Sequence, residues 1–281
     1  VPADPDLEYA VRDAIRATAR RMTEIPMPFL GVRGIRWLAD RMDQLAFLTM
    51  SGVSYAMKNS GAARVGSDLP YLEFAADVTA PSAKRYGRWN NTTKLIEWGT
   101  GNGSIVSTDT PAWELLVAAK AYAKDNYIRG IKEKGGEETF HAFLTPTAMG
   151  RLKLDPTYIA NLRTAQQRGP DNALFTGSSV KVDGIYIHEF RHVYNTRLAA
   201  SGSKWGSGGL VDGQQMLFCG AQAMGMADIG DASWEEKGFD YENQQGISTG
   251  KIVGFKKPQF YTQYSGNTTE DFGVLSLYTA Q

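Results

Sequence analysis

The chain has 281 residues, of which 42% are hydrophobic, 30 are basic and 30 are acidic. This length and apolar content suit a folded protein with one large domain or two modest ones, and they argue against disorder. The charges sum to zero and no block of one sign stands out, which argues against a basic nucleic-acid-binding arm or an acidic tail.

The sequence gives no sign of a membrane or secreted protein. No apolar run approaches the roughly 20 residues that cross a bilayer, and the start, VPADPDLEYA, lacks the layout of a signal peptide. We therefore expect a soluble protein that does not use that secretion route; without an initial Met, processing or a missing upstream segment both stay open. The one cysteine, Cys219, has no disulfide partner and lies in the apolar run MLFCGA, so we expect a buried thiol in a reducing compartment.

The first hundred residues predict two helices followed by an extended region. Residues 7–22 are rich in Arg and Ala, and residues 35–50 repeat apolar side chains at three- and four-residue steps. Between the two, Pro26 and Pro28 break the pattern. From 51 to 108, Gly, Asn, Ser and Pro are frequent, and only 71–75 and 94–98 suggest strands, which predicts a region without a compact core.

The clearest predicted helix runs from about 110 to 129. Asp109 or Thr110 can cap it, Pro111 suits its first turn, and its Ala, Leu and Lys residues favour helix. A strand in TFHAFLT follows, then a helix that restarts at a proline within 146–166. Further on, the Gly-rich stretch SGSKWGSGG predicts a loop, and the last fifty residues predict strands joined by Gly-containing turns.

The stretch HEFRH, residues 188–192, matches the pattern in which a helix presents two zinc ligands and a glutamate base. On a helix, His188 and His192 would converge on one ion, with Glu189 as base. On a strand the same spacing covers about 13 Å and the two side chains cannot chelate. The structure of this segment therefore decides whether a zinc site is possible.

The residues before HEFRH favour the strand. Val180 and Val182 alternate up to Asp183-Gly184, a dipeptide typical of a tight hairpin turn, and Ile185 and Ile187 alternate after it. The opposing observation is a possible helical apolar stripe through Ile187, Phe190, Tyr194 and Leu198. A third ligand would have to be a distant residue: the only other histidine, His141, or one of the carboxylates Asp212, Asp228, Glu235 and Glu236. We expect that His188 and His192 bind no metal.

Other catalytic patterns are weaker. GTGNGS, residues 99–104, has the glycines of a phosphate-binding loop but not its Lys-Ser/Thr ending, so we interpret it as a flexible turn. Adjacent acid pairs such as Glu137-Glu138 point to different sides of an element and are expected to be solvated. No G-x-S-x-G elbow occurs. We predict no catalytic, cofactor-binding or metal-binding residues.

Several local phrases, in their order and spacing, resemble the major capsid proteins of tailed bacteriophages, in particular the family of podoviruses like coliphage N-four. The resemblance runs from about residue 35 to the end, and the first 34 residues match less well. The phrases are TMSG at 49–52, Thr145-Pro146 followed by Asp155-Pro156, the hairpin with Gly177, Asp183 and Gly184, Gly220 to Ala223, Phe239 to Tyr241, and Gly246-Ile247.

This resemblance implies the α+β Hong Kong 97 capsid fold, with a P-domain built on a long spine helix and a β-sheet, an A-domain of mixed sheet and helices, an extended N-terminal arm and an E-loop. On this sequence it implies an arm, helix and E-loop region at 1–108 and the spine helix at 109–136. The A-domain would then span 137–235, and 236–281 would return to the P-domain.

The implied function is structural: a major capsid protein that self-assembles into an icosahedral head shell around phage double-stranded DNA, with no enzymatic activity. Its partners would be copies of itself in hexamers and pentamers, with scaffold, cement and portal proteins as further candidates. Neither sequence-specific DNA binding nor a membrane is expected. The protein would be located in the virion after assembly in the bacterial host cytoplasm. The alternatives are an encapsulin-like compartment shell and the zinc hydrolase of the HEFRH motif.

Overall fold

The computed structural model describes residues 27–65, 78–133, 135–165, 180–239, 244–262 and 268–281. The helix expected at 7–22 and the strand expected at 71–75 lie outside these residues. The chain divides into two compact units, one of residues 1–43 and 227–254 and one of residues 44–226 and 255–281.

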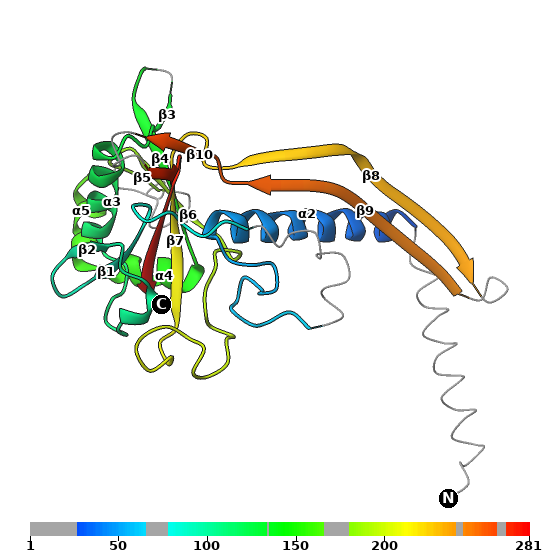
Figure 1. The fold of residues 1–281 in the computed structure, drawn as a ribbon, viewed down its shortest axis with the longest axis horizontal. Helices are drawn as coiled ribbons and strands as arrows, with labels where there is room; N and C mark the ends of the chain where they lie inside the picture. Colours follow the sequence, from blue (N-terminus) through cyan, green and yellow to red (C-terminus); the bar gives the residue numbers. More distant parts are fainter. Residues whose placement is uncertain (1–26, 66–77, 134, 166–179, 240–243, 263–267) are drawn as a thin grey trace, which may run out of the picture. The chain divides into compact units, whose positions relative to one another are not determined.

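The smaller unit contains most of α2 (Met27–Ser51) and of a two-stranded sheet made by β8 (Gly225–Phe239) and β9 (Gln244–Lys256). The two strands run side by side as a long ribbon (Figure 1). The helix expected at 35–50 is confirmed but begins earlier, at Met27. Pro28 does not interrupt it, because a proline in the first turn has no intrahelical N–H bond to lose.

The larger unit is built on one mixed eight-stranded sheet. Its strand order is β2-β1-β12-β7-β4-β6-β5, with β3 paired to β4. The pairs β1–β12 and β4–β6 are parallel, and the other pairs are antiparallel. The strands are β1 Tyr86–Asn90, β2 Leu95–Trp98, β3 Ile131–Lys132, β4 Glu138–Leu144, β5 Val180–Val182, β6 Ile185–Glu189, β7 Gly213–Cys219 and β12 Val274–Ala280.

Three helices, α3 (Trp113–Asp125), α4 (Pro146–Leu154) and α5 (Pro156–Ala165), pack on one face of this sheet (Figure 1). Alternate residues of the strands meet them, so that Phe140, Ile187 and Phe218 are almost fully buried in the main core. A short 3₁₀ turn, η2 (Asn102–Ser104), and the hairpin of β10 (Gln259–Thr262) and β11 (Thr268–Asp271) complete the described elements.

The opposite face of the sheet carries a second, smaller core. Phe47 and Met50, from the end of α2 that belongs to the larger unit, pack there with Leu217 and Cys219 of β7 and with Val193. The ring of Phe47 lies edge-on to Phe143 and stacked on Phe190. Cys219 is a free, buried cysteine, as the sequence predicts.

The helix expected at 110–129 is shorter, and it is not the long helix of the chain. α3 covers Trp113–Asp125, whereas α2 has 25 residues. Asp109 does not cap α3, because its buried carboxylate accepts hydrogen bonds from Arg88 and from the backbone N–H groups of Asn91 and Val106. Asp155 instead accepts a hydrogen bond from the Trp113 N–H at the start of α3.

The expectation of a coreless region at 51–108 is wrong for its second half. Two strands, β1 and β2, pair antiparallel there and join the main sheet through β12. Trp89 of β1 is fully buried, and its indole N–H donates to the Thr110 carbonyl. Buried Gly87 and Trp89 alternate in β1 with partly buried residues, and the polar side chains of Arg88 and Asn90 hid the strand in the sequence.

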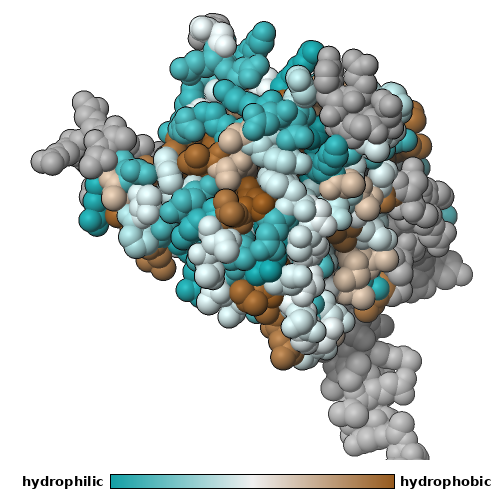
Figure 2. Space-filling view, turned by 60° about the vertical axis from the view of Figure 1, so that its left-hand side comes forward, coloured by the Kyte–Doolittle hydropathy of each residue, from teal (hydrophilic) through white to brown (hydrophobic). Residues whose placement is uncertain are grey.

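Most later expectations are confirmed. The strand in TFHAFLT is β4, the restart at Asp155-Pro156 separates α4 from α5, and SGSKWGSGG contains neither helix nor strand. The last fifty residues contain strands as expected. Figure 2 shows one face of the molecule, mostly polar, with hydrophobic residues in small separate groups. None of the described helices is long and apolar enough to span a bilayer.

Candidate functional site

The HEFRH motif begins in a strand, as predicted. β5 and β6 form a hairpin in which Val182 pairs with Ile185, and the turn residues Asp183 and Gly184 have φ angles of 48° and 70°. Positive φ at both positions is the geometry that Asp-Gly turns favour. β6 ends at Glu189, and His192 lies in the turn that follows. The two histidines therefore do not share a helix face.

His188 instead meets His141, the histidine of the neighbouring parallel strand β4. Nδ1 of His141 lies 2.8 Å from Nε2 of His188, and the two rings are nearly coplanar, with 4° between their planes. Burial lowers the pKa of both histidines; nearby Glu133 opposes this at His141, and His141 itself adds to the lowering at His188. Two imidazoles at this distance share one N–H···N hydrogen bond when both are neutral.

The surroundings of this pair are polar on one side and aromatic on the other. Tyr186 stacks on His141 and donates its hydroxyl to Glu133 at 2.7 Å, and Lys181 forms an ion pair with the same carboxylate at 3.0 Å. Phe143 stacks on His188. The hydrogen bond from Tyr186, followed by that from Lys181, lowers the pKa of Glu133.

The other residues considered as zinc ligands or as the base interact with neighbouring side chains. Glu189 pairs with Lys153 at 3.6 Å, and the buried His192 ring accepts a hydrogen bond from Nε of Arg191. Of the candidate third ligands, Asp212 pairs with Lys204 and Asp228 with Lys251, while Glu236 accepts from the indole of Trp234. Across the described parts of the chain, no three His, Cys, Asp or Glu residues cluster in a way that could hold a metal ion.

GTGNGS, which the sequence predicts to be a flexible turn, contains the turn residue Gly99 and the short η2 helix. Gly99 has a φ of 71°, and the space around Gly101 and Gly103 is open. The segment does not lead directly into a long helix, because α3 begins only at Trp113. It therefore lacks the helix N-terminus on which a phosphate-binding loop depends.

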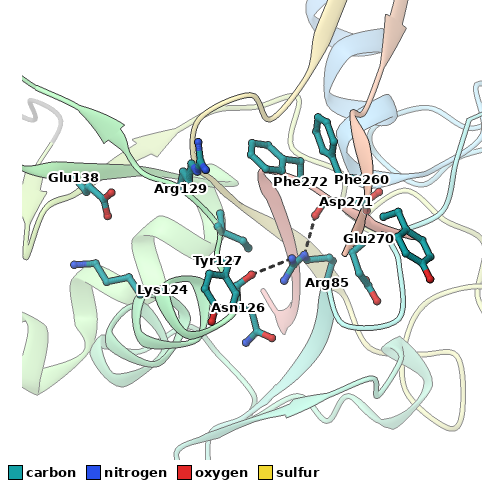
Figure 3. Close-up of a pocket in the computed structure, with 12 residues that line it drawn as sticks. Arg85, Lys124, Asn126, Tyr127, Arg129, Glu138, Phe260, Glu270, Asp271 and Phe272 are labelled. Carbon is teal, nitrogen blue, oxygen red and sulfur yellow. Dashed lines mark hydrogen bonds between the residues drawn. The ribbon is translucent and has the colours of Figure 1, made fainter. Parts of the chain in front are cut away.

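A pocket of about 530 Å³ lies where the end of α3 and the segment after it meet the β10–β11 hairpin, within the larger unit. Arg85 stands at its centre (Figure 3): its guanidinium donates from Nε to the Asp271 carbonyl at 2.8 Å and from Nη2 to the Asn126 carbonyl at 3.1 Å. Burial lowers the pKa of Arg85, and Glu270, Tyr122 and Asp271 act in the opposite direction. Arg85 thereby ties the hairpin to the end of α3.

Beside the pocket, Lys257 and Asp271 form an ion pair at 2.9 Å in which both side chains are 1% exposed. Asp271 also accepts hydrogen bonds from Gln259 and from the backbone N–H of Ser82. Burial lowers the pKa of Lys257, and Asp271 opposes the change through its charge and its hydrogen bond. This network holds Asp271, which lines the pocket, in place.

The rim of the pocket has a different character. Lys124 and Arg129 are exposed on one side of it (Figure 3), and the aromatic residues Tyr127, Phe260 and Tyr261 are 63%, 50% and 69% exposed. Tyr127 has a φ of 60°, which turns the chain at the end of α3. Exposed cations and rings around a hollow suit a protein surface that carries carboxylates and apolar side chains.

Sequence reasoning missed this pocket. Its described residues come from separate segments, near 85, 124–129, 138, 260–261 and 270–272, and none of them forms a local motif. Only the sheet and the β10–β11 hairpin bring them together.

The chain is similar in sequence to phage capsid proteins. The family model described as phage capsid protein matches residues 10–281. The major capsid protein of Pseudomonas phage KPP25 is 59% identical over 244 residues, which is 87% of this chain and 65% of that protein. This chain thus spans less than two thirds of the relative's length.

Solved capsid structures share the fold. The capsid of Ralstonia phage GP4 aligns with a TM-score of 0.63 and 21% identity, covering 87% of this chain and 64% of that one. The capsid asymmetric unit of cyanophage Pam1 aligns with a TM-score of 0.54 and 18% identity, covering 70% and 54%. With the matching family model and the 59% identical relative, these findings show that the chain belongs to the phage capsid protein family.

Proposed function

We propose that this protein is a major capsid subunit, which assembles with copies of itself into the icosahedral head shell that encloses phage double-stranded DNA. The observation that carries the proposal is the 59% identity to a phage major capsid protein over most of the chain. The protein is then a component of the virion and acts through its surfaces. A catalytic role is not required.

The Hong Kong 97 fold, and the kinship with podoviruses like coliphage N-four, are part of the same proposal. The mixed sheet with helices on one face corresponds to an A-domain, and α2 with the β8–β9 ribbon corresponds to the long helix and sheet of a P-domain. We favour this assignment over a spine helix at 109–136 because α3 has only 13 residues and packs within the main core. Capsomers would be hexamers and pentamers, which one chain can form through repeated heterologous contacts.

Electron microscopy of the purified chain after expression in bacteria tests the proposal. We expect closed shells or ring-shaped capsomers, together with a fast-sedimenting fraction in analytical ultracentrifugation. Discrete monomers under all assembly conditions, with hydrolytic activity that disappears after zinc removal and in His188→Ala, would contradict it. Shells that contain a protein cargo instead of DNA when isolated from infected cells would favour the compartment alternative.

A further inference from the structure

The β8–β9 ribbon has an exposed surface on which a partner could bind. In the described part of the chain no third strand pairs with it, and its described β8 residues are exposed along the whole strand. A two-stranded ribbon is marginal in water without further packing. Large apolar side chains nevertheless point to solvent here: Ile229 is 69% exposed, Ile252 68% and Trp234 40%.

The ribbon is also the acidic part of the chain. Residues 225–256, which span both strands and their connection, contain six acidic residues and three lysines, a net charge of −3, and because the whole chain sums to zero the remainder carries +3. Asp231 and Glu235 are exposed on β8. A partner surface for this ribbon should therefore be basic and should offer apolar area.

The pocket rim of the larger unit has these two properties. Lys124 and Arg129 form no ion pair within the described residues, and both are exposed. Tyr127, Phe260 and Tyr261 surround the pocket with exposed aromatic rings. The chain thus carries two different surfaces that complement each other in charge and in apolar content.

We propose that the β8–β9 ribbon of one copy docks on the pocket rim of a second copy, with Asp231 and Glu235 facing Lys124 and Arg129. Trp234 would contact the exposed rings around the pocket. The inference rests on the proposed function, since such a contact between unlike surfaces of identical chains is heterologous and closes into rings when it is repeated. It would also cover the exposed β8 residues, which no third described strand accompanies.

Zero-length cross-linking tests the contact directly. A carbodiimide condenses a carboxylate with a lysine amine only when the two touch. Assembled full-length chain, mixed from ¹⁴N- and ¹⁵N-labelled protein, should give a cross-link between the peptide containing Asp231 and Glu235 and the peptide containing Lys124. The cross-link should join light to heavy chains. Cross-links confined to light–light and heavy–heavy pairs would overturn the proposal.

Charge reversal provides an independent readout. Asp231→Lys with Glu235→Lys, or Lys124→Glu with Arg129→Glu, should each lower the yield of assembled particles by about tenfold, because like charges then face each other. The four substitutions together should restore most of the yield. The control for the ribbon variant is Asp43→Lys with Glu137→Lys, which changes the net charge equally outside both surfaces and should assemble normally. Glu137 is 76% exposed, so the loss of its 3.4 Å ion pair with Lys181 should cost little. Circular dichroism confirms that each variant folds.

The results separate this inference from the proposed function. If the wild-type chain forms shells and the ribbon variants assemble equally well, the docking contact is refuted and the capsid function stands. The same conclusion follows if the fourfold variant does not recover the yield. Ribbon amides that exchange hydrogen equally fast in subunits and shells would refute it as well. A wild-type chain that never associates would refute both.

Discussion

Nδ1 of His141 and Nε2 of His188 lie 2.8 Å apart on the neighbouring parallel strands β4 and β6. The pair lies on the sheet face opposite helices α3 to α5, beside the small core that contains Phe143 and Cys219. The first histidine of HEFRH thus interacts with a histidine 47 residues upstream, and not with the one four residues away.

This pair makes stability depend on pH. The unfolded chain takes up protons on its histidines as the pH falls through their ordinary pKa of 6.5, whereas burial lowers the pKa of both in the folded protein. The unfolded state therefore binds more protons, and the free energy of unfolding should fall as the pH is lowered from 7.5 through 6.5 and further, until both folded histidines are charged. Urea denaturation at closely spaced pH values measures the slope.

Substitutions identify the source of that slope. In His141→Gln with His188→Gln, the decrease between pH 7.5 and 5.5 should be much smaller, because no imidazole pair resists protonation. The control is His192→Gln, which leaves the pair intact and should keep most of the decrease. Carboxylates such as Glu133, whose pKa is lowered, act only below this window. An unchanged slope in the double variant would show that other groups are responsible.

Stability should not depend on a bound transition metal. His188 already has His141 as its partner, and His192 lies beyond the end of β6. We expect that neither EDTA nor one equivalent of Zn²⁺ shifts the thermal midpoint, and that His188→Ala and wild type respond alike. A zinc-dependent rise in the midpoint that is lost in His188→Ala would contradict this expectation.

Removing one charge of the buried Lys257–Asp271 ion pair, while the other remains, should lower the free energy of unfolding. Asp271→Asn leaves a buried ammonium without its counter-charge, and we expect a loss of about 3–5 kcal/mol in the free energy of unfolding. Lys257→Met should cost less than the aspartate change if Gln259 and Ser82 continue to satisfy Asp271. Chemical denaturation of the two single variants and the double variant gives the coupling energy. Additive effects would mean that the pair contributes little.

The Cys219 thiol should be inert in the folded protein. Burial raises its pKa to about 12, so the reactive thiolate is scarce at neutral pH. We expect no reaction with a chromogenic disulfide under native conditions and one equivalent of reaction per chain after denaturation. Rapid labelling of native protein would show that β7 opens easily.

Local sequence patterns predict those parts of the fold that depend on neighbouring residues alone. The Asp183-Gly184 turn predicted the β5–β6 hairpin, and with it the strand that carries His188, because the turn conformation depends on two adjacent residues. The break at Asp155-Pro156 was visible for the same reason. In both cases neighbouring residues determine the backbone.

Long-range contacts explain what the sequence did not reveal. The start of α3 was placed too early because Asp109, a good cap by type, is bound to Arg88, while Asp155 reaches the helix from 42 residues away. Strand β1 was missed because its pairing with β12 joins residues about 190 positions apart, such as Tyr86 and Ser276. The pocket is hidden in the same way, since its cations and rings come from separate segments.

Gly213, at the start of β7, offers a sharp test of packing. A Cβ built there would overlap Cε3 of Trp205, whose ring is 4% exposed and packs edge-on against Tyr278 of β12. Because neither the backbone of β7 nor the buried indole can move freely, we expect Gly213→Ala to lower the free energy of unfolding by about 1–3 kcal/mol.

The matched control is Gly103→Ala, in the η2 turn, where nothing lies within 4 Å of the added Cβ and φ is not positive. It should change the free energy of unfolding by no more than about 0.5 kcal/mol. Trp205→Leu in the Gly213→Ala background removes the clashing ring, so the cost of the alanine should be smaller there than in wild type. Urea denaturation of wild type, the two single variants at 205 and 213 and their double variant measures this difference. An equal cost in both backgrounds would mean that the strand, and not the indole, requires glycine at this position.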